Sequence, residues 1–143
     1  STQPTDTTAW TLGSRAFRQS LLGEGMRGPN ADSADPWAVW WARNTTVLHA
    51  ERIRAPLLIN LAEKEAIMGF PLATRLEELG RPIETYLYPG AYHIKWRPAQ
   101  LLAAQTRAMD WLDFWLSGVE HAAPHEPGRL ARWRALRDRA GGR

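Results

Sequence analysis

Cysteine is absent from the 143 residues of this chain, which excludes disulfide bridges, thiolate zinc sites and cysteine nucleophiles. No apolar run approaches the ~18 residues that a membrane-spanning helix needs, and residues 1–8 are polar without a basic leader. A phosphate-cradling Gly-x-x-x-x-Gly-Lys loop is also missing. His121 and His125 lie in a proline-containing stretch that does not look helical, which argues against a metal site. We therefore expect a cytoplasmic protein that uses no cofactor or metal and does not bind membranes.

The composition is that of one globular domain, with 44% apolar residues, 23% charged residues and a formal net charge of +3. The positive charge is concentrated in residues 129–143, which hold six arginines and one aspartate. Such a run is typical either of a solvated helix or of a nucleic-acid contact. Because Trp133 and Leu136 give it an apolar side, we interpret it as a docked final helix and expect no nucleic-acid partner.

The first third of the chain predicts one helix over residues 9–22, because its apolar residues recur at helical spacing. A stretch rich in turn-forming residues, 24–36, predicts a loop after it. Eight tryptophans in a chain of this length is a high number. We therefore interpret all of them except Trp96 as structural residues.

The second half alternates strands and helices. Short apolar runs predict strands at residues 56–61 and 83–88, the first of them buried on both faces of a sheet. Helices are predicted over residues 66–79 and 98–117, and the apolar face of the second consists of Leu101, Leu102, Met109, Leu112, Trp115 and Leu116. Two strands separated by an amphipathic helix indicate an α/β fold with a parallel sheet.

Two predicted loops follow the carboxyl ends of these strands, where ligands of open α/β sheets bind. The first loop contains Glu63 and Glu65, and the second ends at His93. An acid on one such loop and a histidine on the next are the later members of a Ser…Asp/Glu…His triad. Taken alone, each signal is weak, because a histidine in such a loop is more often structural and acidic loop residues are usually only solvated.

Four stretches resemble the last third of a prolyl oligopeptidase family catalytic domain, and they occur in the right order. They are Arg54-Ala-Pro-Leu-Leu-Ile59, Leu79-Gly-Arg-Pro-Ile-Glu84, Tyr88-Pro-Gly90 closed by His93, and Trp111-Leu-Asp-Phe-Trp-Leu116. The resemblance covers about residues 44–118. It implies the C-terminal portion of an α/β-hydrolase, a doubly wound parallel sheet with flanking helices, and serine peptidase chemistry.

The run His93-Ile-Lys-Trp-Arg-Pro98 departs from the usual His-Gly-Phe of that family and is similar to the His-x-Lys-Trp-x-Pro run of lasso peptide isopeptidases. The Arg132-Trp133 pair in the tail also resembles theirs. This resemblance implies hydrolysis of the isopeptide bond between the N-terminal amine of a lasso peptide and an Asp or Glu side chain. Beside the histidine, the aromatic face of Trp96 and the cation of Lys95 are predicted substrate contacts. The alternative for Trp96 is packing onto the helix that follows.

The triad acid departs from the family's Gly-x-x-Asp-x-x-Val-Pro loop. If Asn60 is aligned with the residue that closes the strand, Glu65 takes the place of the acid, 28 positions before His93. Glu63 stays open as the alternative. Glutamate serves in this role in some hydrolases, provided that its extra methylene group still allows the carboxylate to reach Nδ1 of the imidazole.

The nucleophile elbow Gly-x-Ser-x-Gly is absent, since Ser14 has Leu12 and Ala16 where glycines are needed. We therefore expect this chain to be the C-terminal segment of a longer serine peptidase, and to be inactive alone because loss of a triad serine costs about a millionfold in rate. Its expected partners are a peptide substrate, a lasso peptide in the first place, and the missing N-terminal part of the same enzyme.

We divide the sequence into a partial α/β-hydrolase catalytic domain, residues 1–118, and a linker with a basic C-terminal helix, residues 119–143. Two other functions stay open. Another prolyl oligopeptidase-like peptidase or esterase would differ in substrate only. In a non-catalytic α/β interaction module, His93 and Glu65 would merely form hydrogen bonds.

Overall fold

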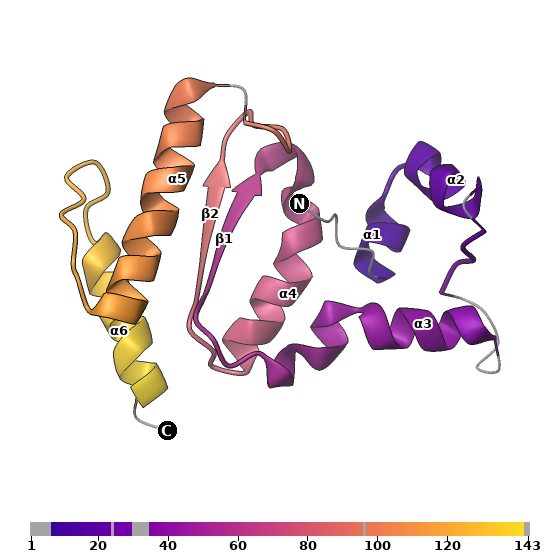
Figure 1. Ribbon diagram of the computed structural model, residues 1–143, viewed down its shortest axis with the longest axis horizontal. Helices are drawn as coiled ribbons and strands as arrows, with labels where there is room; N and C mark the ends of the chain where they lie inside the picture. Colours follow the sequence, from indigo (N-terminus) through magenta and orange to yellow (C-terminus); the bar gives the residue numbers. More distant parts are fainter. Residues whose placement is uncertain (1–6, 24, 30–34, 96, 142–143) are drawn as a thin grey trace.

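A computed structural model describes residues 7–23, 25–29, 35–95 and 97–141. Its sheet consists of two parallel strands, β1 (Leu57–Ala62) and β2 (Ile83–Tyr88). Helix α4 (Ala66–Glu78) joins the two strands. It lies on one face of the sheet, and α5 (Pro98–Leu112) lies on the other (Figure 1). The predicted strand, helix, strand and helix order and the α/β class are therefore confirmed.

The core is split between the two faces of the sheet, because successive side chains of a strand point to opposite sides. Leu57 and Ile59 pack with the buried Leu76 of α4, whereas Ala62 and Tyr88 pack with Ala104 of α5. Helix α4 approaches β1 closely at Gly69. A Cβ atom there would lie only 2.5 Å from Cδ2 of Leu61, so a larger residue would displace either the Leu61 side chain or the helix.

The C-terminal segment packs against the end of α5. That helix continues as a π-helical turn, η3 (Asp113–Ser117), and α6 (Arg129–Gly141) then returns the chain beside it (Figure 1). Trp111, Phe114, Trp133 and Leu136 form one buried cluster between these elements. The basic tail is thus a helix that Trp133 and Leu136 attach to the core, as predicted.

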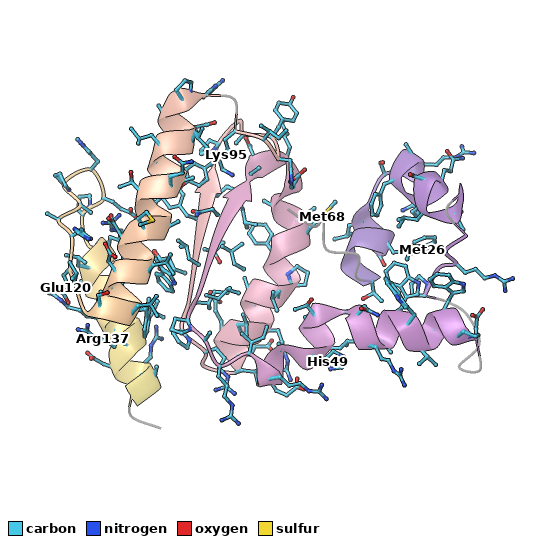
Figure 2. All side chains as sticks on the ribbon, in the orientation of Figure 1. Met26, His49, Met68, Lys95, Glu120 and Arg137 are labelled. Atoms are coloured by element: carbon cyan, nitrogen blue, oxygen red, sulfur yellow. The ribbon has the colours of Figure 1, made fainter. Side chains whose placement is uncertain are left out.

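Four of the five arginines of α6 are paired with acidic side chains, and the fifth, Arg139, donates to the carbonyl oxygen of Ala135 in the same helix. The pairs are Arg129–Asp110 at 2.5 Å, Arg132–Glu126 at 2.8 Å, Arg132–Glu84 at 2.9 Å, Arg137–Glu120 at 3.4 Å, and Arg134–Glu120. Figure 2 shows Glu120 and Arg137 together on the α6 side of the molecule. The hydrogen bond from Arg134 is the main reason why the pKa of the Glu120 carboxyl is lowered. The positive charge of the tail is therefore largely compensated within the fold, which supports its reading as a docked helix.

Replacement of Trp133 should be the most damaging change in this cluster, because its side chain is completely buried. We expect Trp133→Ala to lower the free energy of unfolding by about 3–5 kcal/mol. Among the described residues, Nε1 of Trp133 has no hydrogen-bond acceptor. Trp133→Phe loses no hydrogen bond and retains an aromatic ring, so it should leave a smaller cavity and cost clearly less than Trp133→Ala. Urea denaturation would measure both changes, with a substitution of the exposed Leu116, Leu116→Ala, as the control. If Trp133→Ala and Trp133→Phe lowered the free energy of unfolding equally, this explanation would be wrong.

The predicted helix over residues 9–22 is wrong as a single element. The structure has two helices, α1 (Thr7–Leu12) and α2 (Arg15–Gly23), separated at Gly13. Ser14 caps the second helix, since its Oγ accepts the N–H of Phe17 at 3.1 Å. The guanidinium of Arg18 donates to the carbonyl oxygen of Gly13 at 2.8 Å and so satisfies the end of the first helix. These local hydrogen bonds favour a break that apolar spacing does not reveal.

Helix α3 (Pro36–Asn44) and the 3-10 helix η1 (Thr46–Arg52) lead to β1. Asp35 caps α3 by accepting the N–H of Trp37 at 2.8 Å. The tryptophans interpreted as structural form two clusters, one of Trp10, Trp37, Trp40 and Trp41, and one of Trp111, Trp115 and Trp133 with Phe114. Trp96 lies outside the described residues.

The apolar face predicted for the helix over residues 98–117 is wrong except for Trp115, which packs against the buried cluster of Trp111, Phe114 and Trp133. Leu102 is 66% exposed and Leu116 is 80% exposed, and the same holds in lesser degree for Leu101, Met109 and Leu112. The buried side consists instead of Ala104, Arg107, Trp111 and Phe114. A periodicity argument assigns arginine to the solvent side, but the guanidinium of Arg107 has buried partners that allow it to face the core.

Strand β1 is less buried than predicted. Only Leu61 and Ala62 are fully buried, while the preceding four residues are half-buried. Within the described residues β1 pairs with β2 alone, so the edge of β1 away from β2 has no neighbouring strand. A strand of a doubly wound sheet reaches full burial only when both of its neighbours are in place.

Candidate active site

The carboxyl ends of β1 and β2 lie at the same edge of the sheet because the strands are parallel (Figure 1). A 3-10 turn, η2 (Glu63–Glu65), follows β1, and a loop that begins at Pro89 follows β2. The last register pair is Ala62 with Tyr88. Beyond it, the N–H of Lys64 donates to the carbonyl oxygen of Ala91 at 3.3 Å. The two loops therefore run beside each other for several residues.

The structure brings His93 and Glu65 together at this edge. Nδ1 of His93 lies 2.7 Å from Oε2 of Glu65, and the two side chains are 44% and 34% exposed. Because a carboxylate only accepts hydrogen bonds, the imidazole donates from Nδ1. In a neutral ring this leaves Nε2 as the basic nitrogen. This arrangement is the one in which a triad carboxylate holds its histidine.

The alternative carboxylate, that of Glu63, has a different partner. Its Oε2 accepts the backbone N–H of Gly90 at 2.5 Å. The structure therefore unites Glu65, rather than Glu63, with the imidazole of His93. Sequence reasoning did not foresee the contact between Glu63 and Gly90.

The hydroxyl of Tyr88, at the end of β2, is bound by the buried side chain of Arg107. This hydroxyl accepts from Nη1 of Arg107 at 2.7 Å and donates to Oδ1 of Asn60 at 3.3 Å. The Arg107 guanidinium lies 3.3 Å from the ring centroid of Tyr86, and its Nη2 donates to Glu126 at 2.5 Å. Burial raises the pKa of Tyr88, and the charge of Arg107 offsets part of that rise. Burial lowers the pKa of Arg107 and is the largest single cause, but the hydrogen bond to Glu126 and the charges of Glu126 and the two tyrosines together outweigh it, so the net shift is upward.

The supporting role of Arg107 was not recognised in the sequence, although a signal for it exists. Arg107 lies three residues after Ala104 and four before Trp111, so all three share one face of α5. An arginine on the buried face of a helix requires a buried partner, because an unpaired charge is too costly there. That requirement would have pointed to an acid or a tyrosine hydroxyl nearby.

Lys95 lies near the same edge of the sheet (Figure 2). Its Nζ is 5.2 Å from the ring centroid of Tyr88, so its ammonium group is satisfied within the protein by a cation–π contact. Trp96 lies outside the described residues. The predicted roles of both residues in substrate binding stay predictions.

In the described part of the chain, no three histidine, aspartate or glutamate side chains gather closely enough to hold a metal ion. Every helix described there is also too short or too polar to cross a bilayer.

Comparison with known proteins relates the chain to one enzyme. It is 39% identical over 110 residues to the lasso peptide isopeptidase AtxE2 of Asticcacaulis excentricus, which covers 77% of this chain and 16% of AtxE2. Two solved structures match 97% of this chain and 21% of theirs, each with a TM-score of 0.80. One is the AtxE2 isopeptidase without ligand, at 35% identity, and the other is a serine-to-alanine variant with Astexin3-dC4 bound, at 34%. No family model matches the chain.

The chain spans about a sixth to a fifth of the length of these relatives, which is consistent with a C-terminal piece of such an enzyme. The similarity confirms the predicted prolyl oligopeptidase-like α/β-hydrolase fold. It extends from α1 to α6 and so includes the strand ends at which His93 and Glu65 meet. The chain belongs to the lasso peptide isopeptidase family of serine hydrolases.

Proposed function

We propose that the enzyme containing this chain hydrolyses the isopeptide bond of a lasso peptide, with His93 as general base and Glu65 as the residue that orients it. The observation that carries the proposal is the contact of 2.7 Å between His93 and Glu65 at the carboxyl ends of two parallel strands. Similarity to an isopeptidase supports the choice of substrate. A relative with a peptide bound further supports a peptide as ligand.

In the proposed reaction, a serine outside this chain attacks the carbonyl carbon of the isopeptide bond while His93 takes its proton. The C–N bond then breaks, and the protonated imidazole gives the proton to the departing N-terminal amine of the peptide. The acyl-enzyme formed on the Asp or Glu side chain is hydrolysed by water, again with His93 as base. Glu65 stabilises the imidazolium in both steps. The serine-to-alanine change in the peptide-bound relative fits a serine nucleophile in this scheme.

The substrate proposal is tested on the full-length enzyme by mass spectrometry of a lasso peptide, since hydrolysis adds one water and opens the ring. The controls are a linear peptide of the same sequence and a simple ester. We expect hydrolysis of the lasso peptide at the isopeptide bond and none by this chain alone. Cleavage of the linear peptide or ester, with the lasso peptide left intact, would instead favour an ordinary prolyl oligopeptidase-like peptidase or esterase.

A further inference from the structure

The turn after β1 and the loop after β2 are joined by three successive contacts. Glu63 accepts the N–H of Gly90, the N–H of Lys64 donates to Ala91, and Glu65 meets His93. The contacts continue beyond the last register pair of the sheet. Each successive residue of the first loop contacts a residue further along the second loop. The first two contacts therefore hold the two loops together directly beside the third.

Glu63 is the member of this set whose side chain acts on the backbone. Gly90 has a φ of +66°, a left-handed conformation that turns the chain sharply after β2. The side-chain oxygen of Glu63 accepts the N–H of this glycine, which joins the turn to the residue that follows β1. Glu63 thus holds the turn at Gly90, three residues before His93. The position of that turn decides where the imidazole lies relative to Glu65.

We propose that Glu63 is a positioning residue: by accepting the N–H of Gly90 it keeps the imidazole of His93 in line with the carboxylate of Glu65. This inference rests on the proposed function of His93 and Glu65. It assigns different tasks to two neighbouring carboxylates, of which Glu65 acts on the imidazole and Glu63 acts on the loop that carries it.

The positioning role requires a particular kind of side chain at position 63. Position 63 needs an oxygen acceptor at the end of a side chain of this length, and it does not need a charge. Glutamine retains such an acceptor, whereas alanine removes it. Misalignment of reacting groups by about 1 Å can cost as much as a hundredfold in rate. The loss should fall on kcat, because Glu63 does not act on the substrate.

The test compares Glu63→Ala with Glu63→Gln in the full-length enzyme. We expect Glu63→Ala to lower kcat by about ten- to a hundredfold with KM changed less than about twofold, and Glu63→Gln to restore most of the loss. Glu78→Ala is the matched control, because it removes an exposed carboxylate whose partner, Arg75, lies on the same helix α4. Hydrogen exchange of residues 89–93, followed by mass spectrometry, reports the loop without reference to activity and should accelerate in Glu63→Ala alone.

Two results would overturn the inference. One is a wild-type kcat in Glu63→Ala; the other is an equal loss in Glu63→Gln, which would mean that the charge and not the acceptor is needed. Failure of the proposed function would look different, since His93→Ala would then retain activity while the exchange measurement would still detect the contact between Glu63 and Gly90.

Discussion

His93→Ala in the full-length enzyme should lower kcat by about six orders of magnitude, which is the size of loss seen when the histidine of a serine protease triad is removed. The reason is that the imidazole of His93, oriented by Glu65, is the group proposed to take the proton of the nucleophile. KM should change little, because the imidazole acts on the reacting atoms and not on the remainder of a bound peptide. The rate of lasso peptide hydrolysis, measured at enzyme excess, would report this loss.

His121→Ala is a matched control for this experiment. His121 also contacts a carboxylate at 2.7 Å, that of Asp113, and it is as exposed as His93. Asp113 begins η3 and His121 follows that element, so the pair lies beyond the C-terminal end of α5 and away from the strand ends. In that pair the carboxylate occupies Nε2, the nitrogen that a triad base must keep for the nucleophile. His121→Ala should therefore leave the rate unchanged, and equal losses in both variants would indicate a general structural effect.

Glu65→Gln should lower kcat by up to about four orders of magnitude, as expected when the base loses the partner that sets its tautomer. The amide retains the shape of the side chain but can donate to Nδ1, which would move the imidazole proton to Nε2. That nitrogen would then be unable to accept the proton of a nucleophile. The measurement is again kcat, together with a thermal unfolding curve to show that the variant is folded.

Asp113→Asn provides the corresponding control, since it changes the carboxylate of the His121 pair in the same way. Glu63→Gln should likewise do little. If Glu63→Gln were as damaging as His93→Ala while Glu65→Gln had no effect, the assignment of the acid would be wrong but the triad would stand. If neither carboxylate mattered and His93→Ala retained full activity, the hydrolase mechanism would fail for this segment.

The strands and helices that carry the site were predictable from local patterns. The strand at residues 83–88 and the helix between the strands were found because apolar spacing and glycine or proline boundaries are properties of neighbouring residues. Parallel pairing then follows from the helical connection, and it places both loops at one edge. His93 and Glu65 could be selected from the residues on those loops by their chemistry, and by a family resemblance that the isopeptidase similarity supports.

The features that the sequence did not reveal all depend on contacts between distant residues. The hydrogen bond from Gly90 to Glu63 joins positions 27 apart, and spacing alone does not distinguish that partner from His93. The buried side of α5 was misassigned because Arg107 is stabilised by Tyr88 and Glu126, which lie 19 residues before and after it. The break at Gly13 depends on hydrogen bonds of Ser14 and Arg18 that compete with a continuous helix.

Tyr88 and Glu126, the two partners of Arg107, are synthesised at different times. Tyr88 is synthesised before Arg107, but Glu126 comes from the stretch beyond residue 118, past the boundary that we predict between the catalytic domain and the linker. A buried charge that lacks its partner costs about 3–5 kcal/mol. A nascent or truncated chain that ends near residue 118 would contain every residue of the His93 loop, yet the Arg107 guanidinium that binds Tyr88 would lack its carboxylate partner. The support of Tyr88 is therefore complete only after the stretch that contains Glu126 has been made and has folded back onto α5.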